Sequence, residues 1–247
     1  MTRLAIPIEL CTFVLQHRIV NPFLSYVVLK SICAGRIQYN KNQLSRKLRI
    51  TGKTLDNHLL ILRKLNWVGF DPKSKTLFIR GFDKIRQMYQ FNSRRAIICT
   101  QGDFKTFRAF LFASAVSDIL RYKKRLNWQP SATKKGFAKH LGRQPFFHPL
   151  AVSYLAKLVH ISNTSAGRLK AISEAKGYLT TKENIKATGI LSNKIEFYRN
   201  PRNENKQYLR KTGATIGVQE PDLISTNLQF TRRKKMVTIN KRGIRGE

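Results

Sequence analysis

The sequence predicts a mainly α-helical protein with small β-sheets, organised as two copies of one helix–turn–helix–strand unit joined by a long helix. One observation is a pattern of residues that recurs at a fixed spacing, and another is an apolar content of 42% in 247 residues, enough to bury cores. The predicted domains are residues 1–100 with the first copy, residues 101–191 with the linking helix and the second copy, and residues 192–247 as a basic, poorly structured extension.

The recurring pattern is spaced by 111 residues. Residues 44–51 read LSRKLRIT and residues 155–162 read LAKLVHIS, so both give Leu, a small residue, a base and, later, Ile followed by a hydroxyl. Fifteen residues after each hydroxyl comes a residue that tolerates a left-handed backbone, then an aromatic and an aliphatic residue: Asn66-Trp67-Val68 and Gly177-Tyr178-Leu179. The match runs without a gap, which predicts two copies of one unit.

Each position of the pattern has a physical role. Apolar residues four apart face inward from one short helix. Thr51 and Ser162 can act as N-caps for a second helix, and Asn66 and Gly177 can end that helix. The aromatic and aliphatic residues would then begin a strand. The predicted order is helix, tight turn, helix, strand.

Both copies resemble winged helix-turn-helix domains. Two in one chain resemble the tandem replication initiators of plasmids and phages and, more loosely, winged-helix transcription regulators. The resemblance covers roughly residues 21–90 and 150–190. It implies that the last helix of each unit lies in the major groove and that a β-hairpin wing follows it.

Further elements follow from local signals. Residues 4–20 fit a strand or a short helix equally well, Asn21-Pro22 predicts a helix start, and Gly35 suits its end. Asp103 is the expected N-cap of the long helix. The other predicted segments are a strand at 36–39, helices at 41–49 and 51–65, first-wing strands at 67–71 and 76–81, second-wing strands at 178–181 and 185–190, and a short helix at 136–141 within an irregular connection.

The charge balance predicts a polyanionic partner. There are 47 Lys and Arg against 13 Asp and Glu, a net charge of +34. Charge of this density indicates nucleic acid, and double-stranded DNA is the expected ligand, with RNA as an alternative. No basic amphipathic helix shows a clean apolar face for lipid, so no membrane partner is expected.

The resemblance implies which side chains contact DNA. The side chains expected at base edges or beside them are Lys53, Thr54 and Asn57 in the first copy and Asn163, Thr164, Ser165 and Arg168 in the second. The basic side chains expected to contact DNA phosphates are Lys73 and Lys75 in the first wing, Lys182 in the second, and Arg232, Arg233, Lys234 and Lys235 in the tail.

Two features of the first copy do not fit a helix that only reads DNA bases. Asp56 lies beside the reading face and would repel phosphates, unless it accepts from cytosine or orients an Arg. Leu59–Leu62 makes the end of the helix apolar on nearly every side, so this half is either wrapped by the chain or forms a homodimer interface. We therefore expect the second copy to be the primary reader.

No pattern indicates catalysis, a cofactor or a metal. The acids are scattered, and H-x-H pairs and Gly-rich phosphate loops are absent. His140-Leu141-Gly142-Arg143 spells the H-x-x-R of tyrosine recombinases, but no surrounding pattern supports it. Three cysteines without a C-x-x-C pair predict reduced thiols in a cytosolic protein.

The sequence as a whole predicts a non-enzymatic, site-specific double-stranded DNA-binding protein of replication-initiator type. A transcription regulator is the alternative within the same class. An architectural protein that coats nucleic acid through charge is the alternative from another class. The expected location is the nucleoid in the cytoplasm of a bacterial or phage-infected cell.

Overall fold

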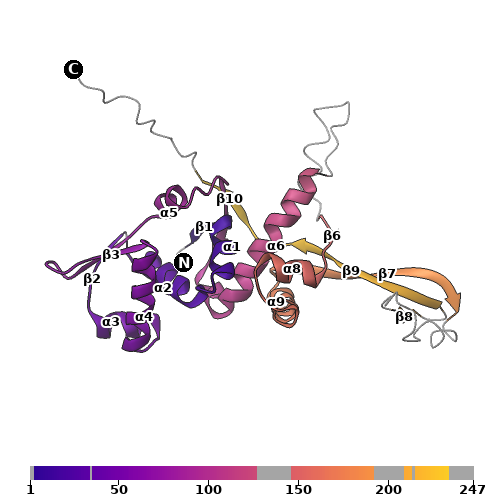
Figure 1. Cartoon of the computed structure of the whole chain (residues 1–247), viewed down its shortest axis with the longest axis horizontal. Coiled ribbons are helices and arrows are strands. Elements are labelled where there is room, and N and C mark those ends of the chain that lie inside the picture. The colour runs from indigo at the N-terminus through magenta and orange to yellow at the C-terminus, as the bar shows by residue number, and fades with distance from the viewer. Residues whose placement is uncertain (1–2, 34, 127–145, 192–208, 213–214, 234–247) are drawn as a thin grey trace, which may run out of the picture. The chain divides into compact units, whose positions relative to one another are not determined.

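The computed structural model describes residues 3–33, 35–126, 146–191, 209–212 and 215–233. It is a mixed α/β fold of helices and small antiparallel sheets, which confirms the predicted combination of these elements (Figure 1). The chain divides into two compact units. Unit 1 takes residues 1–111 and 229–247, and unit 2 takes residues 112–228.

Unit 1 combines a bundle of short helices with two three-stranded sheets, in the orders β1-β5-β10 and β2-β4-β3. Its elements are β1 (Leu4–Pro7), α1 (Ile8–Gln16), α2 (Val20–Ile32), β2 (Arg36–Gln38), α3 (Lys41–Leu48), α4 (Gly52–Lys64), β3 (Val68–Asp71), β4 (Thr76–Ile79), α5 (Phe82–Met88), β5 (Arg95–Cys99), the 3-10 helix η1 (Gln101–Thr106) and β10 (Phe230–Arg232). The predicted helices, the strands predicted at 67–71 and 76–81 and the strand before α3 are confirmed to within a few residues.

Unit 2 carries a four-stranded sheet in the order β6-β9-β7, with β8 also paired to β9. The chain enters it through α6 (Phe107–Leu126), whose first residues belong to unit 1. The other elements are β6 (His148–Pro149), α8 (Val152–Leu158), α9 (Asn163–Ala175), β7 (Leu179–Leu191), β8 (Leu209–Thr212) and β9 (Thr215–Thr226). The predicted helix at 136–141 lies outside the described residues.

The core of unit 1 is aromatic. Trp67, the aromatic of the repeated pattern, is fully buried, and its ring centroid lies 5.7 Å from those of both Phe23 and Tyr26. The Tyr26 hydroxyl donates to the carbonyl of Arg80 at 2.7 Å, and burial raises the pKa of this hydroxyl. This bond links α2 to the end of β4, so the helix pair and the sheet share one core.

Three expectations about element boundaries need correction. The N-terminal run is both a strand and a helix, because β1 lasts four residues and α1 begins directly after Pro7. Asp103 does not cap α6; it is the fourth member of a capping box in which Thr100 caps η1, and the Thr100 backbone amide donates to Asp103 at 2.7 Å. β7 runs unbroken over Leu179–Leu191, so residues 178–190 do not fold back as a hairpin.

The C-terminal region is also more ordered than expected. β9 and β10 both lie within residues 192–247, and Phe230–Arg232 pairs antiparallel with β5 of unit 1. The predicted poorly structured extension is therefore wrong for these strands. Residues 234–247, the end of the basic tail, lie outside the described residues.

Candidate nucleic-acid interface

The two helix pairs have the same backbone geometry at the predicted spacing of 111 residues. α4 and α9 both have thirteen residues, and their first residues are Gly52 and Asn163. Thr51 accepts from the Thr54 amide and Ser162 accepts from the Ser165 amide, each at 3.2 Å. Both predicted N-caps are confirmed.

The turns and helix ends match as well. Arg49 and His160 close the first helix of each pair with φ of 56° and 54°, although neither is glycine. Asn66 and Gly177 follow the second helix with φ of 59° and 69°, as expected for residues that end a helix in the left-handed region. Every non-helical residue of the repeated pattern therefore has an equivalent in the other copy.

The sheets extend this equivalence to strands that the sequence did not relate. In unit 1, Leu77 of β4 pairs with Ile37 on one side and Phe70 on the other. In unit 2, Ile224 of β9 pairs with His148 and Thr181.

The hydrogen bonds that join strand to helix pair also correspond. The Arg80 amide donates to the Trp67 carbonyl and the Asn227 amide to the Tyr178 carbonyl, each at 3.0 Å. β9 is therefore the counterpart of β4. β7 and β9 form a long ribbon in unit 2, where unit 1 has a short hairpin (Figure 1).

The outward face of α4 contains two of the three residues expected near DNA. Lys53 and Asn57 are exposed, together with Asp56 and Leu60, at helical spacing. Thr54 is half-buried, and its hydroxyl bonds that of Thr51 at 2.8 Å. Thr54 therefore belongs to the helix cap, and Asp56 takes its place on the outward face.

The outward face of α9 is polar. Asn163, Thr164 and Arg168 are exposed, whereas Ser165 is half-buried and its hydroxyl accepts from that of Ser162 at 2.9 Å. Gly167 occupies the position that corresponds to Asp56. A Cβ at Gly167 would meet nothing within 4 Å, so packing inside the protein gives no reason for a glycine there.

Asp56 is held by two residues that the sequence did not single out. Lys41 Nζ, at the start of α3, lies 2.5 Å from Asp56 Oδ2, and the Tyr39 hydroxyl donates to Oδ1 at 3.2 Å. The hydrogen bond from Lys41 lowers the pKa of Asp56, and the same bond raises the pKa of Lys41. No sequence rule joins positions fifteen apart on two different helices, so only the fold reveals this cluster.

The turn of the first wing presents its two lysines to solvent. Lys73 and Lys75 are exposed, and Lys75 has φ of 47°. Asp71 accepts from the Lys73 amide at 3.0 Å and from the Ser74 hydroxyl at 2.7 Å. The Ser74 bond is the main reason that the pKa of Asp71 is lowered. The carboxylate stabilises the turn and leaves both lysine side chains without an acid partner in the turn.

Two of the basic side chains predicted to contact DNA from the second wing and the tail make contacts within the protein. Lys182 Nζ lies over the ring of Phe147, 4.4 Å from the ring centroid. Arg232 is exposed on β10. Arg233 makes a bidentate pair with Asp83, with both N–O distances 2.8 Å, and also donates to the carbonyl of Ala5 at 2.6 Å. Arg233 is therefore held by unit 1 rather than lying in a free tail, and its contact with phosphates stays a prediction. Lys234 and Lys235 lie outside the described residues.

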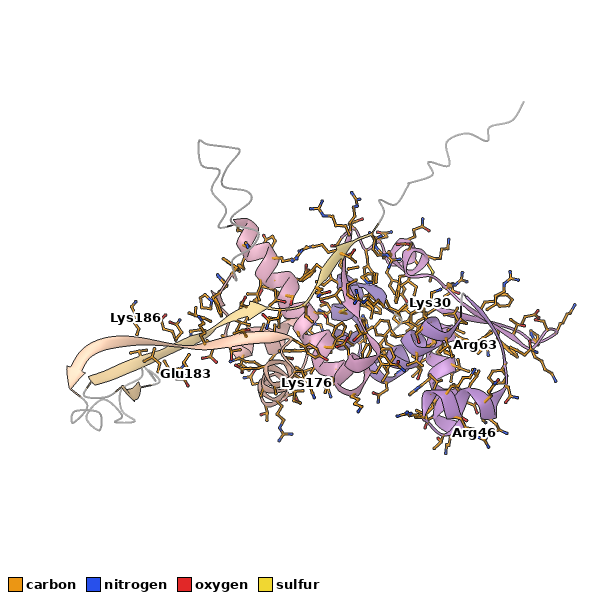
Figure 2. The ribbon with its side chains drawn as sticks, turned by 180° about the vertical axis from the view of Figure 1, so that it is seen from behind. Lys30, Arg46, Arg63, Lys176, Glu183 and Lys186 are labelled. Carbon is orange, nitrogen blue, oxygen red and sulfur yellow. The ribbon has the colours of Figure 1, made fainter. Side chains whose placement is uncertain are left out.

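The helix pair and hairpin of unit 1 are strongly basic. Residues 36–80 contain eleven Lys and Arg and two Asp. Figure 2 shows Arg46 of α3 and Arg63 of α4 among the side chains of this region. The described residues 146–191, 209–212 and 215–228 of unit 2 contain eight Lys and Arg and four Asp and Glu. Two of those acids lie near bases, since Lys170 pairs with Asp222, and Lys186 lies 3.8 Å from Glu220.

The end of α4 is less apolar on its surface than its sequence predicts. Leu59 and Leu62 are buried, so they are wrapped by unit 1 itself, whereas Leu60 is 52% exposed. His58 bonds the Ser25 hydroxyl of α2 through Nδ1 at 2.8 Å, and partial burial lowers its pKa. One exposed leucine gives no support to a large homodimer interface on this helix.

The described part of the chain holds no group of three or more His, Cys, Asp or Glu that could bind a metal ion. Cys11, Cys33 and Cys99 form no disulfide bond in the described part of the chain. None of the described helices is both long and apolar enough to cross a bilayer. No protein-family model, curated protein or solved structure matches this chain.

Proposed function

We propose that this chain is a non-enzymatic, site-specific double-stranded DNA-binding protein with two winged helix-turn-helix units, of the replication-initiator type. The observation that carries the proposal is the duplicated geometry, in which two capped thirteen-residue helices follow equivalent turns and precede equivalent sheets. In a winged helix-turn-helix unit, the side chains of such a helix read base edges and the hairpin contacts the backbone. The net charge of +34 supports a polyanionic partner.

The charge distribution favours unit 1 as the primary reader, which reverses our expectation from the sequence. Its helix pair and hairpin carry a large excess of bases over acids, and both acids already have partners. The corresponding described residues of unit 2 have a smaller excess. Because phosphate contacts supply much of the affinity, unit 1 should contribute more of it.

The two outward faces also differ in chemistry, which bears on the form of the site. Lys53, Asp56 and Asn57 of α4 correspond to Thr164, Gly167 and Arg168 of α9. A symmetric dimer reads a palindrome with two identical faces. One chain with two unlike faces instead reads a site with two unlike halves, and this is the property we propose.

The test is fluorescence-anisotropy binding to a random-sequence duplex and to duplexes tiled from the DNA around the gene, at 50 and 200 mM salt. Random duplex should lose about 10³- to 10⁵-fold in affinity for roughly six to ten phosphate contacts. One tile should remain bound when random duplex has dissociated. Equal loss on every tile would refute site-specific reading and support a protein that coats nucleic acid through charge.

Matched variants assign the contacts. Asn57→Ala and Arg168→Ala should each relax the preference at one position of the site by about 1 to 3 kcal/mol. Lys84→Ala is the control, because Lys84 is an exposed base on α5. In Figure 1 the label and ribbon of α5 lie apart from those of α3 and α4 within unit 1. If all three variants weaken binding equally on every sequence, the outward faces of α4 and α9 do not read bases. Opening of an AT-rich duplex by the bound protein would separate an initiator from a regulator.

A further inference from the structure

Asp56 is the only carboxylate on α4, and it lies on a surface that is otherwise basic. Its side chain and that of its partner Lys41 are both 47% exposed. An ion pair this exposed contributes little to stability, because solvent screens it. A carboxylate here also weakens attraction to phosphates. The structure therefore gives no folding reason for an acid at this position.

Three features hold the Asp56 carboxylate in one place. Lys41 bonds one oxygen, and Tyr39 bonds the other. The Tyr39 ring packs edge-on against Phe70 of the wing, with centroids 5.6 Å apart. Gly52, at the first turn of α4, makes room for Lys41, since a Cβ there would lie 2.6 Å from Lys41 Cε. The cluster of Tyr39, Lys41 and Asp56 is thus fixed by the connection between β2 and α3, by α3 and by α4 together.

The bonded carboxylate keeps free acceptor capacity. An ionised carboxylate has about four lone-pair positions on its two oxygens, and Lys41 and Tyr39 occupy one on each oxygen. The hydrogen bond from Lys41 lowers the pKa of Asp56, so the group is ionised at neutral pH and can only accept. The neighbouring ammonium group also offsets its repulsion of phosphates.

We propose that Asp56 is a specificity-determining residue that accepts a hydrogen bond from the N4 amino group of a cytosine in the major groove. This inference rests on the proposed function of unit 1 as a DNA reader. Cytosine N4 is a donor that carboxylates recognise, whereas the N7 acceptor beside the adenine amino group would repel a carboxylate. Tyr39 and Lys41 act as positioning residues that aim the Asp56 oxygens.

The test is selection of bound duplexes from a random library with the full chain, followed by affinity measurements. The wild-type protein should prefer cytosine at one position of the site. In Asp56→Ala the ratio of affinities for cytosine over the other bases at that position should fall about tenfold. Asp56→Ala should at the same time bind random duplex more tightly, because a negative charge has gone. This opposite change in preference and general affinity is the expected signature.

Two further variants separate positioning from charge. Tyr39→Phe keeps the ring against Phe70 but removes the bond to Asp56, so it should weaken the cytosine preference without a change on random duplex. Asp71→Asn, in the wing turn, removes the other acid of residues 36–80 and should leave the cytosine preference intact.

The outcomes that overturn the inference are distinct from those that overturn the proposed function. If Asp56→Ala gains affinity equally on every duplex and keeps the cytosine preference, Asp56 only repels phosphates and the inference is wrong. The same holds if the wild-type site has base preferences but no cytosine among them. If the wild-type protein shows no preference at any position, the proposed function fails, and the inference fails with it.

Discussion

Two glycines of unit 2 offer a controlled test of the repeated helix and its end. Gly167 lies inside α9, and Gly177 follows the helix with φ of +69°. A Cβ would meet no atom within 4 Å at either position. Substitution by alanine therefore changes only the backbone preference and not the packing, and the two variants should respond with opposite sign.

The expected magnitudes follow from backbone conformation. Gly167→Ala should stabilise the protein by about 0.5 to 1 kcal/mol, because glycine in a helix interior costs that much relative to alanine. Gly177→Ala should destabilise it by about 1 to 2 kcal/mol, since an L-residue in the left-handed region pays a steric penalty of that size. For a chain of this length the melting temperature should shift by about 2 to 4 °C per kcal/mol.

The assay is thermal and urea unfolding followed by far-UV circular dichroism. Opposite shifts for the two variants would support the described backbone. A loss of stability in Gly167→Ala, or no loss in Gly177→Ala, would refute the reasoning. DNA binding adds a second readout: if α9 lies close to DNA at this position, the new methyl group of Gly167→Ala should weaken binding although the protein is more stable.

Three other predictions concern unit 1 and the wing. Arg233→Ala should lower the free energy of unfolding by about 1 kcal/mol in urea titrations, since it breaks a bidentate pair whose acid, Asp83, is 57% exposed, whereas Arg232→Ala, at an exposed site, should change it by less than about 0.5 kcal/mol. The Arg233 hydrogen bond lowers the pKa of Asp83, so this stabilisation is complete above the unfolded pKa of about 3.9 and is lost as the pH falls through the lower folded value; Asp83→Asn should flatten unfolding curves measured across this range. Lys73→Ala and Lys75→Ala should each reduce the slope of log affinity against log salt by about one if both wing lysines contact phosphates, and unchanged slopes would place the wing away from DNA.

The helix pairs could be predicted from the sequence because their signals are local. A hydroxyl residue precedes each helix, and a residue tolerant of positive φ follows it. These two residues define the ends of α4 and α9 to within one helical turn. The hairpin of β3 and β4 could be predicted equally well, because its two strands are joined by a four-residue turn. In each case the residues that determine the element are close together in sequence.

The pairing of β7 with β9 could not be predicted because it is not local. β7 pairs with β9, and more than twenty residues separate the end of one strand from the start of the other. The sequence offered a nearer partner, residues 185–190, and nothing in strand propensity excluded it. The same limit applies to β10, whose pairing with β5 joins segments more than one hundred residues apart, and to the Arg233–Asp83 pair.

The Asp56 cluster shows why the candidate site was only partly predictable. Helical spacing placed Asp56 beside the reading face, and the sequence left its role open. The fold adds Lys41 and Tyr39, which change an isolated repulsive charge into a held and compensated acceptor. A charge on a recognition surface must therefore be judged by its partners, because the same carboxylate excludes DNA when alone and can select a base when it is neutralised and aimed.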